Sequence, residues 1–177
     1  FPGVFLPVTI GRKSSLKLIH EAEAAGKNIG IVCQKLPDTE YPELKDLHQI
    51  GTVARIIRTI EMPDKSRAVI LQGIRRFKLE EITETTPYLL GNITPLEDEM
   101  PSQNDKEFQA LVDSIKDTTI HLIKTSDLYP QESTIAIKNN NSPVFIINFI
   151  SANLPLKKDD KMQLLCIDSF RDRAYQL

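Results

Sequence analysis

This sequence has only two cysteines and no long apolar run, and both shortages argue against a membrane or secreted protein. No apolar stretch approaches the roughly 20 residues that a membrane helix needs, and no basic segment followed by an apolar one stands at the N-terminus. We therefore expect no membrane partner and no signal peptide. Cys33 and Cys166 each lie in an apolar run, which favours buried, reduced thiols and a cytoplasmic location over a disulfide.

Glycine is scarce, proline is at an ordinary level, and neither sign of charge is in large excess. Seven glycines and eleven prolines among 177 residues exclude a collagen-like or low-complexity chain. The 22 basic and 24 acidic residues give a net charge of −2. Residues 1–97 hold 13 basic and 12 acidic residues, and residues 98–177 hold 9 and 12, so neither part forms the polybasic surface that nucleic acid requires. We expect no nucleic-acid partner.

Catalytic motifs are absent as well. The sequence has no GxxxxGK[ST], GxGxxG, GxSxG or HExxH motif, and the run from Gly11 to Ser14 lacks the first glycine of a phosphate-binding loop. The three histidines are isolated in sequence, and neither cysteine belongs to a CxxC pair, so no metal site is indicated. Glu80 and Glu81 would point to opposite faces of a strand. We predict no catalytic residue, no cofactor and no metal site in this chain.

The first part of the chain has the pattern of strands with one early helix. Strands are expected at 4–10, 29–35, 51–60, 67–72, 74–82 and 88–96, with residues 62–66 as a hairpin connection and 36–47 as a polar loop. Pro7 favours an edge position for the first strand. A helix is expected to start at Ser14 or Ser15 as N-cap and to end at Gly26. A bulge near Glu80 would turn Phe77, Leu79 and Ile82 to one side.

The apolar period changes near residue 97. Residues 98–104 resemble a linker. Two overlapping capping boxes start within it, one from Ser102 to Asp105 and one from Asn104 to Glu107. Helical spacing continues over 108–123, 130–139, 143–153, 158–167 and 169–177, with Ser142 as the N-cap before Pro143. Both faces of 53–60 are apolar, so a curled sheet or small barrel is expected before this helical bundle. We predict an α+β fold with domains 1–97 and 98–177.

Three features are candidates for binding. The Arg12-Lys13 turn is the one protein-binding contact that we nominate, although solubility also explains two exposed cations. Arg75-Arg76 is expected to open a strand and to pair with a glutamate across it. The runs 4–6 (VFL) and 41–44 (YPEL) are candidates for an exposed groove, with core packing as the favoured explanation for the strand.

Several ordered blocks carry a family resemblance. The opening run FPGVFLPVTIGR (1–12), the blocks GTVARI (51–56) and QGIRRF (72–77), and the run NLPLKKDDKMQLL (153–165) occur in one order over essentially the whole chain. Together they resemble the N-terminal domain of ATP-dependent Lon proteases. The resemblance implies a β-rich PUA-like pseudobarrel followed by a helical bundle, in agreement with the periodicity.

The resemblance also implies a parent protein. It implies a cytoplasmic homohexamer that uses ATP and Mg, with a serine-lysine protease module downstream of this chain, so no catalytic residue transfers to it. The implied role is to bind unfolded or tagged protein substrates and to support hexamer assembly. The chain starts with Phe1 rather than methionine and lacks the strand that usually precedes FPG, so we expect a piece of a longer protein. A stand-alone adaptor and an RNA-binding module are the alternative interpretations, the latter by analogy of fold alone.

Overall fold

The structure, a computed structural model, describes residues 1–63, 67–102, 104–126 and 133–177. It divides into two compact units, Phe1–Leu96 and Glu97–Leu177, whereas the change of period placed the boundary between residues 97 and 98. The first unit is rich in antiparallel strands and the second is helical, which confirms the α+β fold class. Among the described residues, no helix combines the length and apolar character needed to cross a membrane.

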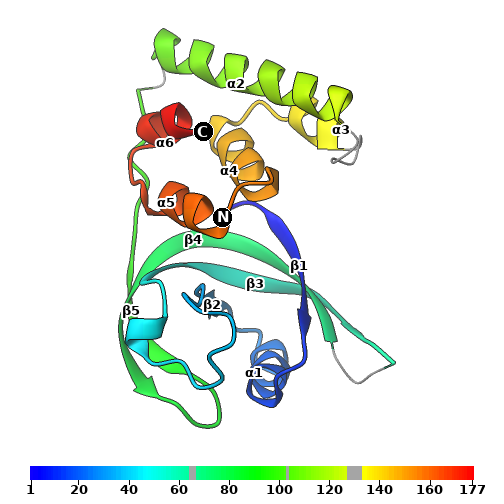
Figure 1. Cartoon of the computed structure of the whole chain (residues 1–177), viewed down its shortest axis with the longest axis vertical. Coiled ribbons are helices and arrows are strands. Elements are labelled where there is room, and N and C mark those ends of the chain that lie inside the picture. Colours follow the sequence, from blue (N-terminus) through cyan, green and yellow to red (C-terminus); the bar gives the residue numbers. More distant parts are fainter. Residues whose placement is uncertain (64–66, 103, 127–132) are drawn as a thin grey trace. The chain divides into compact units, whose positions relative to one another are not determined.

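One antiparallel sheet organises the first unit. Its strands are β1 (Phe5–Ile10), β2 (Ile29–Ile31), β3 (Ile50–Glu61), β4 (Arg67–Glu84) and β5 (Leu90–Pro95). The order along the sheet is β1-β4-β3-β2, and β5 pairs with the last part of β4. Because β4 is 18 residues long, it pairs with β1 over residues 67–72, with β3 over 67–78 and with β5 over 77–84. Figure 1 shows β3 and β4 curving over β2, as the expected curled sheet requires.

The edges of this sheet are informative. Strand β1 pairs with β4 alone among the described strands, which confirms the edge position inferred from Pro7. Strand β2 ends at Ile31, four residues earlier than expected, because the chain then leaves the sheet. It returns in an isolated bridge between Gln34 and Leu47, and the short 3-10 helix η1 (Leu44–Asp46) lies within the loop.

Strand β4 continues through Gly73, where the sequence suggested a break. The register shifts so that Ala54 faces Gly73 and Val53 faces Arg75, which leaves one extra residue on β4. The Gly73 amide donates to the Val4 carbonyl at 3.0 Å, and a Cβ at Gly73 would lie 2.2 Å from the Phe1 carbonyl oxygen. Glycine therefore permits the close approach of the N-terminal residues. Arg75-Arg76 lies inside β4 rather than opening a strand.

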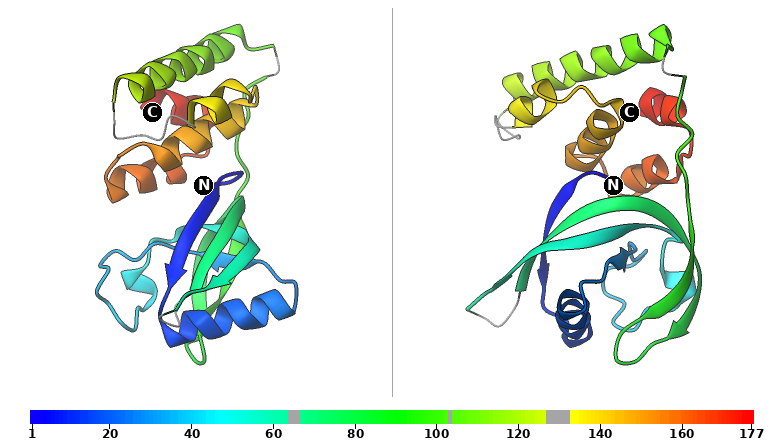
Figure 2. Two further views of the ribbon diagram at one scale, coloured as in Figure 1. Left: turned by 90° about the vertical axis from the view of Figure 1, so that its right-hand side faces the viewer. Right: turned by 180° about the vertical axis from the view of Figure 1, so that it is seen from behind.

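Helix α1 (Lys13–Ala24) begins earlier than predicted. Arg12 is the N-cap and makes no side-chain capping bond, so neither Ser14 nor Ser15 has the expected role. The helix ends as predicted, since Gly26 has a φ of 62°, in the left-handed region that glycine adopts readily. Both views in Figure 2 place α1 across the unit from the arch of β3 and β4.

Apolar side chains of α1 and the sheet form the core of the first unit. One cluster joins Ile19 of α1 to Val69 and Leu71 of β4. A second contains Phe77 and Leu79, with Ile82 packed against it. The β4–β5 register shifts just after Leu79, which confirms the predicted bulge and explains how these three side chains reach one side.

The second unit consists of helices. They are α2 (Lys106–Thr125), α3 (Ser133–Lys138), α4 (Pro143–Asn153), α5 (Lys158–Cys166) and α6 (Phe170–Gln176). The predicted capping boxes placed the N-cap of α2 at Ser102 or Asn104, and both positions were wrong. The N-cap is Asp105, whose side chain accepts a hydrogen bond from the Phe108 backbone amide at 3.0 Å. Ser142 caps α4 as predicted. The expected helix start at Pro130 and the hairpin residues 64–66 lie outside the described residues.

The centre of the second unit is the apolar helix α4. Ile146, Ile147 and Ile150 are buried against Val112 of α2 and Phe170 of α6. Three polar side chains of this unit are also fully buried: Asn148 and Ser151 of α4 and Arg173 of α6. Ser151 donates to the Ile147 carbonyl, and Arg173 donates to Asn148. The predicted bundle core is therefore present, and it contains a charged group that the apolar pattern did not indicate.

Candidate functional site

A cavity of about 570 Å³ opens on the concave side of the sheet in the first unit. Its wall comes from α1, β2, β4, β5 and the turn between β4 and β5. Most of the lining side chains are apolar: Leu18, Ala22, Ala25, Ile29, Val32, Leu47, Phe77, Leu79, Ile82, Leu89, Leu90 and Ile93. An apolar cavity of this size matches the lower part of the range that small-molecule and side-chain sites occupy, about 300–1,000 Å³.

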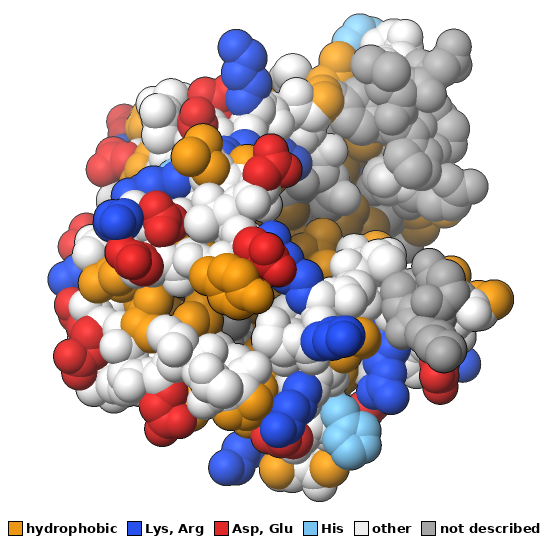
Figure 3. All heavy atoms as spheres, turned by 60° about the horizontal axis from the view of Figure 1, so that its bottom comes forward, with side chains coloured by type: hydrophobic (Ala, Val, Ile, Leu, Met, Phe, Trp, Pro, Cys, Tyr) orange, Lys and Arg blue, Asp and Glu red, His pale blue; other side chains and the backbone are white. Residues whose placement is uncertain are grey.

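Three apolar side chains of this wall remain partly exposed. Leu89, Leu90 and Ile93 keep between 36% and 42% of their surface accessible. All six residues of β5 are exposed, so this strand has apolar side chains but no cover among the described residues. On the face drawn in Figure 3, hydrophobic side chains gather in patches bordered by acidic and basic ones. Exposed apolar surface beside a cavity is typical of a binding site.

The polar groups of the cavity lie at its rim. The Tyr88 hydroxyl donates a hydrogen bond to Glu21 Oε2 at 2.6 Å, which joins the β4–β5 turn to α1. This bond, with smaller effects of desolvation and of the charges of Glu21 and Glu84, raises the pKa of Tyr88. Lys17 Nζ lies 3.7 Å from Glu21 Oε1 on the same helix. Glu21 and Lys27 are the charged residues that line the cavity among the described residues. The rim is therefore polar and charged, while the wall is apolar.

The acidic side chains of β4 do not converge on one point. Within the described ranges, no three His, Cys, Asp or Glu side chains come close enough together to hold a metal ion. Glu80 is paired with Lys78 at 2.9 Å, and this contact lowers the pKa of Glu80. Glu81 accepts a hydrogen bond from Asn92 Nδ2 at 2.5 Å. The two adjacent carboxylates thus have separate partners and do not act on one substrate atom.

The nominated contact residues lie elsewhere. Arg12 donates from its guanidinium to Gln34 Oε1 at 3.2 Å and to the carbonyls of Pro37 and Thr39 at 3.3 and 3.4 Å. Lys13 is the exposed first residue of α1, and neither cation lines the cavity. The structure gives Arg12 a role in holding the loop after β2. A role for Arg12 and Lys13 in protein binding stays a prediction.

The other sequence candidates are distributed over the first unit. Phe5 and Leu6 are 55% and 52% exposed, so core packing was the wrong explanation for these two, although Val4 is buried. Tyr41 is also highly exposed. The residues directly opposite Arg75 and Arg76 are Val53 and Thr52, not a glutamate, because β3 has its glutamate at its far end. None of these residues joins the cavity wall.

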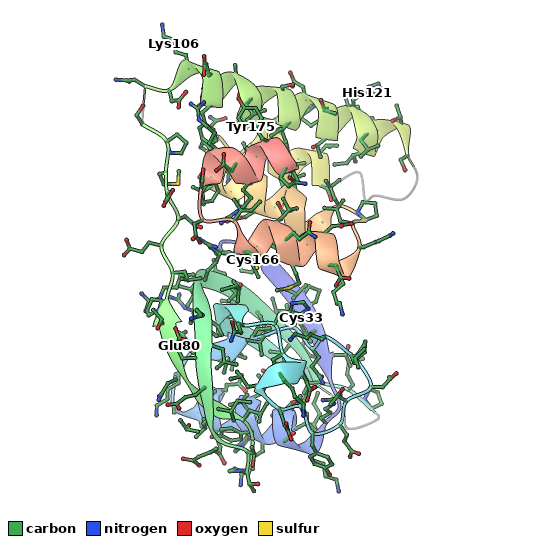
Figure 4. The ribbon with its side chains drawn as sticks, turned by 60° about the vertical axis from the view of Figure 1, so that its left-hand side comes forward. Cys33, Glu80, Lys106, His121, Cys166 and Tyr175 are labelled. Carbon is green, nitrogen blue, oxygen red and sulfur yellow. The ribbon has the colours of Figure 1, made fainter. Side chains whose placement is uncertain are left out.

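The cysteines differ from expectation. Both are free thiols, but Cys166 is exposed at the end of α5 and Cys33 is half-buried in the loop after β2. Figure 4 labels both, together with Glu80, Tyr175 and the two residues near opposite ends of α2, Lys106 and His121. The apolar run around Cys166 misled because Leu164 and Leu165 are buried and Cys166 follows them at the last position of the helix.

Sequence reasoning did not find the cavity. Its wall is drawn from segments between Leu18 and Ile93, and no short motif unites them. The sequence feature that points toward the cavity is the strand 88–96. Its apolar residues Leu89, Leu90 and Ile93 do not alternate regularly with polar ones. Such a strand next to a free sheet edge predicts an exposed apolar surface only when the topology is known.

Comparison with known proteins identifies the family. The model for the ATP-dependent protease La (LON) substrate-binding domain matches residues 1–177. The chain is 49% identical over its whole length to a Lon protease of Parabacteroides distasonis and 46% identical over 99% of its length to one of Flavobacterium johnsoniae. It spans about a fifth of these relatives, 22% of each.

Solved structures agree on the fold. The N-terminal domain of Mycobacterium avium complex Lon protease matches with a TM-score of 0.73 at 17% identity, and a Lon N-terminal domain protein from Xanthomonas campestris with 0.68 at 18%. Each match covers 99% of this chain and 88% of the other. The predicted family is thereby confirmed. The chain belongs to the family of ATP-dependent protease La (Lon) substrate-binding domains.

Proposed function

We propose that this chain is the non-catalytic recognition module of a Lon-type ATP-dependent protease and that it binds segments of unfolded or tagged proteins. The observation that carries the proposal is the match of the substrate-binding family model to all 177 residues. The apolar cavity and the exposed apolar strand β5 support it, because unfolded proteins differ from folded ones in presenting apolar side chains to solvent.

The proposal extends to the whole protein. The parent would be a cytoplasmic homohexamer, with Mg and ATP bound and a serine-lysine dyad placed outside this chain. Six copies of a weak site would raise the effective concentration of each site for a captured polypeptide, so each domain needs only modest affinity. Finding a Walker A motif downstream in the same open reading frame would support this parent. A stop codon directly after residue 177 would favour the stand-alone adaptor instead.

The direct test is a titration of the chain with one protein in two states. A permanently unfolded variant of a small protein and its folded form share nearly the same composition, so any preference reports exposure of apolar segments. We expect saturable binding to the unfolded form and none to the folded form. Equal, negligible binding to both at high concentration would overturn substrate capture, and a salt-sensitive shift of RNA in a gel would favour the RNA-binding alternative.

The nominated Arg12-Lys13 contact needs a separate test, because Arg12 holds the loop after β2. Lys13→Glu reverses an exposed charge without removing those bonds, and Lys106→Glu is a matched change at the exposed first residue of α2. If Lys13 contacts substrate, the Lys13 variant weakens binding of the unfolded protein more than the Lys106 variant does. Equal affinities for the two variants would remove Lys13 from the binding surface.

A further inference from the structure

The sheet of the first unit leaves strand β5 with one free edge. Among the described residues, β5 pairs with β4 alone, and its six residues are all exposed. The outer backbone N–H and C=O groups of such an edge are available to another chain in extended conformation. Proteins usually block edges of this kind with lysine, proline, a bulge or a covering element. The run LGNITP has no charged residue, and its one proline, Pro95, is its last residue.

The same strand forms part of the cavity wall. Leu90, Gly91 and Ile93 of β5 line it together with Leu79 and Ile82 of β4. Ile93 faces Leu79 and Gly91 faces Ile82 in the ladder, so these residues lie on one side of the β4–β5 pair. A strand added to β5 would continue this surface and would place alternate side chains on the cavity side.

Charge favours a particular kind of segment. The part of the chain from 77 to 95 that forms the β4–β5 pair and its turn has one lysine and three glutamates. Glu21 and Glu84 both act on the Tyr88 hydroxyl at the rim, whereas Lys27 is the basic side chain of the wall. Lys17 and Lys27 offset the charges of Glu21 and Glu84 at the rim, so the acidic excess that complements a basic residue lies on the β4–β5 pair and its turn.

We propose that the free edge of β5 binds an extended polypeptide as an added antiparallel or parallel strand, with one apolar side chain in the cavity and a basic residue beside it. The proposal rests on the proposed function and names its substrate class. Backbone pairing supplies affinity that depends little on sequence, the cavity supplies a preference for an apolar residue, and the glutamates of the β4–β5 pair supply a preference for a basic one. This combination suits a module that recognises many different unfolded proteins.

A pair of matched variants tests the cavity. Both Ala24 and Ala25 are exposed, but Ala25, the C-cap of α1, lines the cavity and the neighbouring Ala24 does not. Ala25→Phe places a large side chain where the guest side chain would go, and Ala24→Phe adds the same group outside. For a labelled short peptide with a central phenylalanine flanked by lysines, we expect Ala25→Phe to weaken binding by about tenfold or more and Ala24→Phe to change it little.

Modified peptides test the strand pairing. Alternate residues of an added strand point their N–H groups toward β5, so N-methylation of one alternate set blocks pairing and methylation of the other set does not. We expect one methylated peptide to lose binding and its counterpart to keep it. Equal affinity of the two would overturn strand addition, and equal affinity of lysine-flanked and glutamate-flanked peptides would overturn the charge preference.

These outcomes separate this inference from the proposed function. If the unfolded protein binds wild type, Ala24→Phe and Ala25→Phe equally, the chain captures unfolded protein by another surface and the β5 proposal is wrong. If the unfolded protein binds none of the three, the proposed function itself fails. Circular dichroism of both phenylalanine variants shows whether each retains the native fold before the comparison is made.

Discussion

The hydroxyl of Tyr88 lies 2.6 Å from Glu21 Oε2, although 67 positions separate these two residues in the chain. The bond connects the turn before β5 to the third turn of α1, at the rim of the apolar cavity. A carboxylate acceptor stabilises the neutral phenol, since a phenolate would lose the bond and be repelled by the charge. This contact therefore links the geometry of the rim to the protonation of one tyrosine.

We predict that Tyr88 titrates at higher pH than an ordinary tyrosine. Its pKa is raised above 10, mainly by the hydrogen bond to Glu21. The stability that this bond contributes is fully present below the pKa of an unfolded tyrosine, about 10, and is lost as the pH rises through the raised value. Phenolate absorbance of wild type minus that of Tyr88→Phe isolates the titration. Glu21→Gln should lower the pKa of Tyr88, whereas Glu23→Gln on the same helix should leave it unchanged.

A second prediction concerns the buried cation of the helical unit. Arg173 is fully buried and donates to Asn148 Oδ1 at 3.1 Å, to Asp98 Oδ1 at 2.7 Å and to the Ile167 carbonyl, and its guanidinium lies 4.5 Å from the Phe170 ring centroid. Arg173→Leu removes the donor that these acceptors share, and one of them, the Asn148 side chain, is fully buried. We expect a loss of about 3–5 kcal/mol in unfolding free energy, measured by urea denaturation.

The matched control for that loss is Arg171→Leu on the same helix. Arg171 pairs with Asp105 and with Glu107 at the surface, where a third of its side chain is exposed. Exposed ion pairs contribute little because water solvates both partners when they separate. A similar loss for both variants would mean that helix propensity or general packing, not the buried bonds, explains the effect of Arg173.

How far the sequence predicts this molecule depends on the range of the interactions involved. The long helix α2, the cap at Ser142 and the bulge after Leu79 follow from local spacing and capping chemistry, and all were predicted. The early start of α1 was not, because the helix begins at Arg12 without a side-chain capping bond and so carries no capping signal.

The long-range features were not predictable in the same way. Asn148 lies within the apolar run VFIINFI. This local pattern does not predict that Arg173, 25 residues later, donates a hydrogen bond to the Asn148 side chain. The cavity likewise depends on how β4 bends between its pairing with β3 and with β5. Local patterns determine which residues turn inward, while the closure of the sheet determines whether space remains between them.

A third prediction concerns a glycine in the sheet. A Cβ at Gly51 would lie 2.5 Å from the Ile31 carbonyl oxygen and 2.7 Å from the Phe77 ring. In Gly51→Ala, β2 and the Phe77 ring must therefore both move away from residue 51. We expect a loss of about 1–3 kcal/mol in unfolding free energy. Gly11→Ala is the control, because nothing lies within 4 Å of a Cβ there. Thermal melts of the two variants should differ clearly, and equal melting temperatures would contradict the close approach.

The last prediction concerns acid sensitivity at the start of α2. The Asp105 carboxylate accepts from the Phe108 amide at 3.0 Å and from Arg171, and these bonds lower the pKa of Asp105. Its contribution to stability is complete above the pKa of an unfolded aspartate, about 4, and is lost as the pH falls through the lowered value. Asp105→Asn keeps a capping oxygen without the charge. We expect the variant to melt below wild type at neutral pH and the difference to shrink in acid.

The control is Asp113→Asn, which removes an exposed carboxylate that accepts from the Gln109 side-chain amide at 3.2 Å. The difference in melting temperature between this variant and wild type should not shrink in acid in the same way. A constant difference between wild type and Asp105→Asn across the acid range would show that the charge at this cap does not stabilise the helical unit.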